Sequence, residues 1–156
     1  MKSYFYTALK RKAMSKYINA TPESGKEFYQ RFHDKGKVVM LNLLKFKAKA
    51  DYSGLDHLKP EGEISGEQAY ELYMECTLPE LQKAGGEVLY FGRSNSFLIG
   101  PESEQWDAVL LVEHQSVAMF MQFAQNEDYL KTAGHRAAAL EDSRLLPTCR
   151  GNKFPF

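Results

Sequence analysis

The chain has 156 residues, which corresponds to one domain, or to one domain with an appendage, and such a domain buries roughly 70% of its unfolded surface without disulfides. Lys and Arg together number 20, as do Asp and Glu, and this balance argues against a strong electrostatic nucleic-acid binder. No apolar stretch reaches about 18 residues, and no apolar run follows the early basic residues, so we expect neither a membrane span nor a secretory signal.

The two cysteines, Cys76 and Cys149, form no recognisable motif. Unpatterned cysteines suit a reducing compartment, so we expect a cytoplasmic protein in which both behave as small buried hydrophobes. The four histidines are scattered along the sequence, and none stands at metal-ligand spacing from a thiol. We therefore expect no metal site and no cofactor.

Residues 1–37 are expected to form an N-terminal extension with helical character. Residues 1–20 mix aromatic with basic residues, and two interpretations are open: an arm that packs on the domain or on a partner subunit, and a basic segment for an anionic surface. The neutral net charge favours the arm. Thr21 followed by Pro22 is typical of a helix start, and this helix should run to about residue 32.

Residues 38–46 form a nearly continuous apolar run, typical of a strand buried on both sides. Asn42 interrupts it and should face the same side as Met40 and Leu44, because side chains alternate along a strand. The long segment 47–64 has no steady period. It is either a lid or dimer clasp, or a surface insertion.

Ser65 and Gln68 form a capping box, which predicts a helix that ends at Gly85-Gly86. Pro79 should kink this helix or begin its last turn anew. Residues 87–99 are expected to form a long strand, with a bulge or bend at Gly92.

The next strand is expected at residues 106–114. A broken helix follows, with a first piece after Ser116 and a second piece at residues 129–140. The closing strand covers residues 142–149, and residues 150–156 form a tail.

This order, β-α-β-β-α-β over residues 38–149, is the ferredoxin-like pattern, an α+β fold with a four-stranded antiparallel sheet. The strands are apolar on both faces, but the pattern contains only two helices. One face of the sheet is therefore left uncovered within the monomer. An exposed apolar face of this size invites aggregation, so we expect a homodimer that packs sheet on sheet. A cover formed by the N-terminal segment folding back is the alternative.

From residue 38 to about 148 the chain resembles the family known as domain of unknown function 1330, within the dimeric α/β-barrel superfamily. The resemblance implies a ferredoxin-like fold, sheet-to-sheet dimers and an unassigned function. It rests on Leu41-Asn42-Leu43-Leu44 with Phe46, Ala50-Asp51-Tyr52, Ser65-Gly66, Ala69-Tyr70, Tyr73, Gly85-Gly86, Ile99-Gly100, Trp106-Asp107, Leu111-Val112, His135-Arg136 and Ala139 to Leu145.

His135 and Arg136, with Asp142 and Arg144, form a dense polar set near the start of the last strand. As a site, the arginine would clamp an anion or carboxylate and the histidine would move a proton. As structure, the basic pair would offset a helix dipole, and Asp142 with Arg144 would form an ion pair across a dimer seam. Both interpretations are open.

Asn42 could orient a ligand carbonyl in an apolar pocket, or hydrogen-bond a neighbouring strand. Three aromatic residues, Tyr70, Tyr73 and Trp106, would line the same cleft or belong to the core. Arg93 begins a polar stretch in the second strand, at a pocket mouth or at an exposed end.

These residues lead to two functional hypotheses. The first is an oxygenase-like or isomerase-like enzyme acting on a small aromatic or carboxylate metabolite, with His135, Arg136 and Asn42 as catalytic residues. The second is a non-catalytic small-ligand-binding or stress-response dimer. In both, the partners are a second copy and a small molecule, with no nucleic acid and no membrane.

Overall fold

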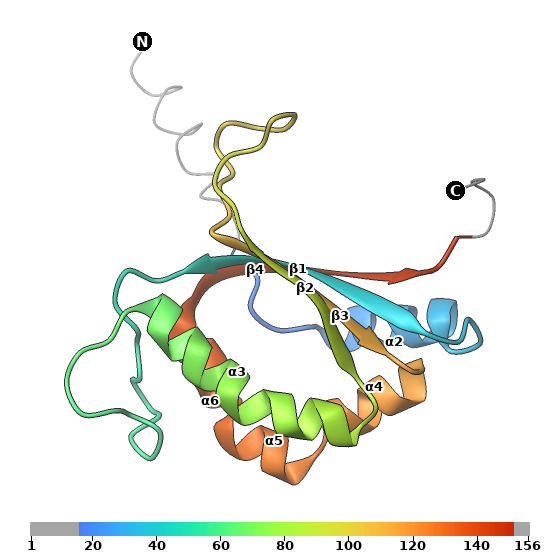
Figure 1. Ribbon diagram of the computed structural model, residues 1–156, viewed down its shortest axis with the longest axis horizontal. Helices are drawn as coiled ribbons and strands as arrows, with labels where there is room; N and C mark the ends of the chain where they lie inside the picture. The colour runs from blue at the N-terminus through green and yellow to red at the C-terminus, as the bar shows by residue number, and fades with distance from the viewer. Residues whose placement is uncertain (1–15, 152–156) are drawn as a thin grey trace, which may run out of the picture.

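The computed structural model describes residues 16–151, which form a four-stranded antiparallel sheet with helices on one face (Figure 1). The strands are β1 (Val38–Phe46), β2 (Glu87–Arg93), β3 (Ala108–His114) and β4 (Leu140–Cys149). Their order in the sheet is β2-β3-β1-β4, the ferredoxin-like arrangement. This confirms the predicted α+β fold.

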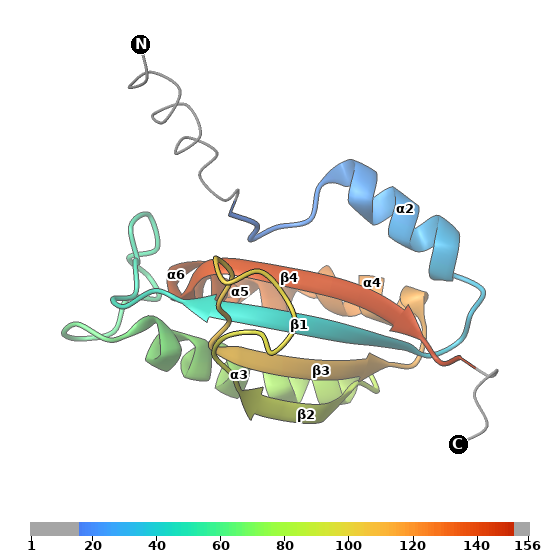
Figure 2. The ribbon, with the colours of Figure 1, turned by 90° about the horizontal axis from the view of Figure 1, so that it is seen from above.

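The helix layer contains α3 (Gly66–Lys83), α4 (Val117–Ala124), α5 (Glu127–Thr132) and α6 (Gly134–Ala139). The second helical stretch is therefore divided into three helices, where two pieces were predicted. A further helix, α2 (Pro22–Phe32), lies beside the β4 edge of the sheet (Figure 2). None of the helices among residues 16–151 is both long and apolar enough to cross a membrane.

The predicted capping box at Ser65 is present, and the predicted helix start at Thr21 is a second capping box. The Thr21 hydroxyl accepts from the Ser24 backbone N–H, and the Ser65 hydroxyl accepts from the Gln68 backbone N–H. In each box the side chain of the third helical residue, Ser24 or Gln68, accepts in turn from the backbone N–H of the cap. Pro79 lies inside α3, which continues as one helix to Lys83, so of the two alternatives the restart is excluded and the kink stays a prediction.

The prediction of a strand reaching residue 99 is also wrong. β2 ends at Arg93, and residues 94–107 form a hairpin arm that rises from the sheet on the side away from the helices (Figure 1). Pairing continues into the base of this arm outside the named strands, through Ser94 N–H to Asp107 O and Trp106 N–H to Asn95 O, each at 2.9 Å, and an isolated bridge between Ser96 and Gln105. The irregularity in β2 lies between Val88 and Tyr90 rather than at Gly92.

The two faces of the sheet differ in what covers them. On the inner face, the side chains of Val38, Met40 and Leu44 are buried beneath the helices. On the outer face, Figure 2 shows the strands uncovered by any helix. The register places on this face an apolar set that spans all four strands: Val39, Leu41, Leu43, Tyr90, Val109, Leu111 and Leu146.

The segment between β1 and α3 is anchored at its base. The backbone N–H of Lys47 donates to Ala139 O at 2.8 Å, and that of Asp51 donates to Ala138 O at 2.9 Å. A third bond, from Ala50 N–H to Ile64 O at 2.9 Å, closes the loop on itself. These bonds tie the segment to α6 and favour a surface insertion over a lid.

Gly66 sits where three backbone segments meet. A Cβ atom at this position would lie 2.5 Å from Ala139 O and 2.6 Å from Lys47 N, and closer still to Lys47 O. Backbone atoms cannot move aside cheaply, so we expect Gly66→Ala to lower the free energy of unfolding by about 1–3 kcal/mol, measured by urea denaturation.

The matched control is Gly25→Ala in α2, where a Cβ atom would have no neighbour within 4 Å. Alanine is the better helix former, so this variant should be neutral or more stable by about 0.5–1 kcal/mol. Equal effects of the two substitutions would contradict the steric explanation for Gly66.

Candidate functional site

A cavity of about 470 Å³ lies between the helix layer and the inner face of the sheet. This volume falls within the range of ligand pockets in proteins. Its walls are mostly apolar, and they come from β1, β3, β4, α3, α4, α5 and α6: Met40, Leu110, Val112, Met74, Leu81, Phe120, Phe123, Ala124, Leu130, Ala133, Ala137 and Leu145.

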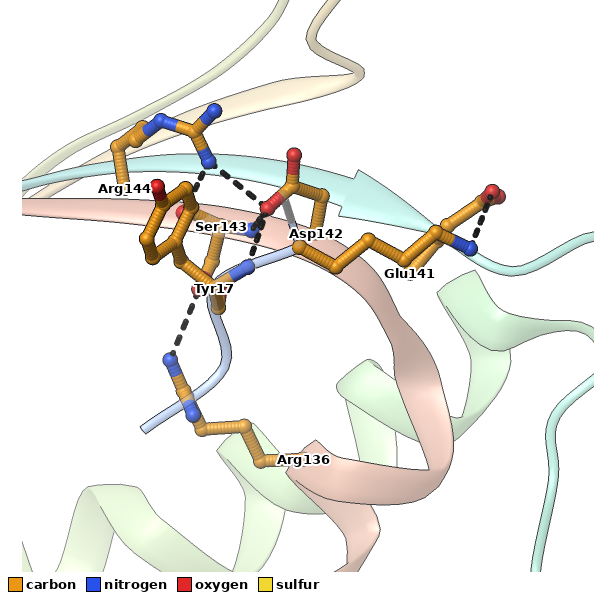
Figure 3. A network of polar contacts seen from close by, with 7 residues as sticks. Tyr17, Arg136, Glu141, Asp142, Ser143 and Arg144 are labelled. Atoms are coloured by element: carbon orange, nitrogen blue, oxygen red, sulfur yellow. Dashed lines mark hydrogen bonds and ion pairs between the residues drawn. The ribbon is translucent and has the colours of Figure 1, made fainter. Parts of the chain in front are cut away.

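One wall of the cavity is a strap, residues 16–20, which runs against the start of β4 (Figure 3). The Tyr17 N–H donates to Asp142 Oδ1 at 2.8 Å, and Tyr17 O accepts from the Ser143 hydroxyl at 2.5 Å. The next carbonyl, that of Ile18, accepts from Arg136 Nη1 at 2.6 Å. These bonds hold the strap in place, and residues 18–20 line the cavity.

Arg136 brings a positive charge to this apolar cavity. Its guanidinium contacts Ile18 O, and more distantly the Ser143 hydroxyl at 3.4 Å, and no carboxylate among residues 16–151 lies within ion-pair distance of it. Burial raises the pKa of Tyr70, and the Arg136 charge opposes that shift. The charge of Arg136 is therefore felt by a side chain that lines the cavity, and the guanidinium remains available to an anionic group.

Asn42 also lines the cavity, at its centre. Its Nδ2 donates to Met40 O and to Leu110 O, each at 3.3 Å. Among the described side chains and backbone, no donor reaches its Oδ1. The amide therefore bonds a neighbouring strand and still presents an acceptor to a ligand.

Sequence reasoning missed two residues of this cavity, Thr77 and His114. Their side chains are 4% and 3% exposed, and Thr77 Oγ1 and His114 Nδ1 have no hydrogen-bond partner in the described part of the chain. A buried polar group without a partner costs about 1–3 kcal/mol. The sequence feature that could have identified them is a polar residue at a position predicted to be buried: Thr77 on the apolar face of its helix, and His114 at the end of an apolar strand.

The sheet separates the candidates proposed from sequence into two groups. The inner cavity brings together Asn42, Tyr70, Tyr73 and Arg136. The register places Asp142 and Arg144 on the outer face, opposite Lys45 and Leu43. Residues of one strand that are one position apart face opposite sides, so Ser143 turns inward while its neighbours turn outward.

The outer-face residues form a stacked cluster of their own. The Arg144 guanidinium lies 4.9 Å from the centre of the Trp106 ring and 4.7 Å from that of Tyr17. It also pairs with Asp142 at 2.8 Å. This ion pair forms within one chain, and an ion pair across a dimer seam stays a prediction.

His135 and Arg93 point elsewhere. Successive residues of a helix project about 100° apart, so His135 faces the loop and meets the Tyr52 hydroxyl at 2.7 Å through Nδ1, while Arg136 faces the cavity. Burial, with the charge of His57, lowers the pKa of His135. Arg93 lies at the end of β2 and pairs with Glu67 at 2.5 Å.

The cavity offers hydrogen bonds and one cation rather than strong acid–base groups. Tyr73 and Tyr129 share a hydrogen bond at 2.9 Å, and burial raises the pKa of Tyr73. No Asp or Glu of residues 16–151 lines the cavity, and no cluster of metal-ligating side chains occurs in the same part of the chain. The arrangement is suited to binding an anionic, largely apolar molecule.

The burial of His114 has a measurable consequence. Burial lowers its pKa from 6.5 to about 4, so between these values the unfolded state binds a proton that the folded state does not. Stability is therefore lost as pH falls from 6.5 to 4, by about 3 kcal/mol for this group. We expect His114→Gln to lose this part of the pH dependence, measured by urea denaturation across the range.

The control is His33→Gln, a substitution of an exposed histidine at the end of α2. It should leave the decline of stability between pH 6.5 and 4 as in the unaltered protein. A His114→Gln profile parallel to that of the unaltered protein would show that His114 is not the buried neutral imidazole described above.

No protein-family model and no curated protein matches the chain. Among solved structures, it is similar to the RPA0582 protein of unknown function from Rhodopseudomonas palustris, at 32% identity and a TM-score of 0.77, over 88% of this chain and 99% of that one. The methylated form of RPA0582 gives 32% identity and a TM-score of 0.78, over 90% and 98% of the two chains.

A dimeric protein of unknown function and ferredoxin-like fold from Bacteroides fragilis is 12% identical, with a TM-score of 0.46, over 74% of this chain and 97% of that one. The similarity to RPA0582 is of another order, since about a third of the residues are identical over almost the whole of both chains. The chain therefore belongs to the same family as the RPA0582 protein.

Proposed function

We propose that the chain is a homodimeric ligand-binding protein, and that its cavity takes a small aromatic or aliphatic carboxylate. The observation that carries this proposal is the Arg136 guanidinium, which faces an apolar cavity of about 470 Å³ and has no carboxylate partner among the described residues. A guanidinium in such surroundings is best satisfied by the carboxylate of a ligand whose body fills the apolar space.

Binding fits the lining residues better than chemistry does. His114 has its pKa lowered to about 4 by burial, so it is a weak base at neutral pH. Burial also raises the pKa of the lining tyrosines Tyr70 and Tyr73, which keeps them protonated. An oxygenase-like or isomerase-like reaction needs a group that removes a proton from the substrate, and none of these is poised to do so.

The predicted catalytic trio is thereby reduced to two binding residues. In this proposal, Arg136 holds the carboxylate and Asn42 receives a polar group through its Oδ1, while His135 serves to hold the loop through Tyr52. Tyr70 and Tyr73 line the ligand site. Trp106, Arg144 and Asp142 stabilise the strap, and Arg93 has no part in the site.

We also propose that the family of this chain is the one known as domain of unknown function 1330. Two of the motifs behind the resemblance have physical roles here. Gly66 allows the close contact of α3 with the backbone of Lys47 and Ala139. Asp142 and Ser143 bind the strap that forms a cavity wall. The cytoplasmic location stays a prediction.

The outer face of the sheet supports the homodimer. Seven apolar side chains spread over all four strands, and the hairpin arm beside them carries Leu98 and Ile99, which are 99% and 92% exposed. An apolar face in the middle of a sheet is a common basis for two-fold association, because the same surface on a second copy complements it. A second copy packed sheet on sheet is the occupant we propose.

The carboxylate proposal is tested by calorimetric titration with straight-chain carboxylates from octanoate to dodecanoate and with phenylpropanoate. At least one should bind, and more tightly than its uncharged amide. Arg136→Gln should weaken binding about 10- to 100-fold, because a hydrogen bond to a charged group contributes about 1.5–3 kcal/mol. Arg136→Lys should keep the preference for the carboxylate.

The control variant is Arg93→Gln, which removes an arginine outside this cavity and should leave affinity unchanged. Failure of every carboxylate to bind, or equal affinities for Arg136→Gln and the unaltered protein, would contradict the proposal. Mass spectrometry of the recovered ligand separates binding from catalysis, since a chemically changed ligand would favour the enzyme hypothesis.

The dimer is tested by the mass in solution, measured by light scattering at micromolar concentration. The unaltered chain should have twice the monomer mass of 17.8 kDa. Leu111→Glu places a charge at the centre of the outer face and should shift the protein to monomer, because an unpaired buried charge at an interface is strongly unfavourable.

Tyr29→Glu is the control, since Tyr29 is an exposed apolar residue of α2, away from the outer face. This variant should keep the mass of the unaltered protein. A monomeric mass for the unaltered chain would refute the dimer and would favour a cover supplied from within the same chain.

A further inference from the structure

The cavity contains a second polar region that the carboxylate end does not explain. It consists of Thr77 on α3 and His114 at the end of β3, both almost fully buried and both lining the cavity. Thr77 Oγ1 and His114 Nδ1 have no hydrogen-bond partner within residues 16–151. Buried polar atoms in native proteins are nearly always paired, so these two atoms point to a group that residues 16–151 do not supply.

The sheet register separates this region from Arg136. The guanidinium lies near Ser143, which pairs with Leu44, whereas His114 pairs with Val38. Those two positions of β1 are six residues apart, or about 20 Å along the strand. On α3, Thr77 stands about 10 Å beyond Tyr70 and about 6 Å beyond Tyr73, the two tyrosines whose rise in pKa the Arg136 charge opposes. The cation and the unpartnered pair therefore lie toward opposite ends of the cavity.

The surroundings of the pair define the group it would accept. The His114 ring is edge-on to Phe120 at 5.0 Å and tilted against Phe123 at 5.7 Å, and Leu81 and Val112 complete this end of the cavity. No charged side chain of the described residues lines it, so a charged group would stay unpaired there. A hydroxyl can both donate and accept, and a carbonyl can accept from threonine, so a neutral oxygen fits.

We propose that the natural ligand is an amphipathic carboxylate that bears a hydroxyl or carbonyl oxygen at its far end, held by Thr77 and His114. This inference rests on the proposed carboxylate site and adds the substrate class. The apolar middle of the cavity contacts the body of the molecule, Arg136 binds one end, and the threonine–histidine pair binds the other. Only a ligand whose length spans the two polar ends can bind both, so the cavity selects ligands by length as well as binding them tightly.

The test compares straight-chain carboxylates from octanoate to dodecanoate with their ω-hydroxy counterparts, by calorimetric titration of the full chain. At the best-fitting length, the ω-hydroxy acid should bind about tenfold more tightly than the plain acid, the effect of one or two net hydrogen bonds. Thr77→Val, a change of similar volume, should abolish this preference by weakening the binding of the ω-hydroxy acid. Thr77→Ser, which keeps the hydroxyl, should retain it.

His114→Phe should also abolish the preference, and Thr132→Val, whose hydroxyl bonds within α5, is the control that should not. Equal affinities for plain and ω-hydroxy acids in the unaltered protein, or a preference that survives Thr77→Val, would overturn the inference while leaving the carboxylate site in place. Failure of both series to bind would refute the carboxylate site and this inference together. Thermal unfolding of each variant establishes that the compared proteins are folded.

Discussion

The apolar character of β1 on both of its faces is the constraint from which the rest of the structure follows. This strand lies between β3 and β4, so its backbone hydrogen bonds are satisfied on both sides. Its inward side chains, such as Val38 and Leu44, are fully buried beneath helices. Its outward side chains are equally apolar, although no helix of the described chain covers them. The favourable free energy of removing apolar surface from water is roughly proportional to the area buried, so this face favours association with a second apolar surface.

The helices do not fill the inner side completely. Between them and the sheet remains a cavity whose walls are apolar, except for a cation near one end, an amide in the middle and an unpartnered threonine–histidine pair near the other. Native interiors are packed as densely as organic crystals, and their polar atoms are paired. A space of this size with unsatisfied polar atoms departs from both rules in one place, which is the reason for regarding it as a binding site.

Ligand binding is also connected to the N-terminal strap. Arg136 donates to the Ile18 carbonyl while Asp142 and Ser143 hold Tyr17, so the residues around the cation also build one wall of the cavity. Arg144 stacks between the rings of Tyr17 and Trp106 on the outer face. The start of β4 thus links the inner cavity to the face on which we propose that a second copy packs.

Local patterns were sufficient for the elements of this fold. The apolar run at residues 38–46, the helix start at Thr21, the capping box at Ser65, and the alternation of strands with helices predicted the ferredoxin-like arrangement. These patterns depend on the alternation of side chains along a strand and on hydrogen bonds between residues three positions apart. Both operate within one element. The end of β2 was misjudged, because the apolar residues 97–99 have strand character but extend beyond the paired ladder into the hairpin arm.

The grouping of side chains was decided by tertiary structure. His135 and Arg136 are neighbours in sequence, but His135 faces a loop and Arg136 faces the cavity. Asp142, which was grouped with Arg136, lies on the other face of the sheet. Thr77 on α3 and His114 on β3 line one cavity only because tertiary packing places the helix layer over the sheet. Sequence determines which face of its own element a side chain occupies, whereas the neighbour on that face depends on how separate elements pack.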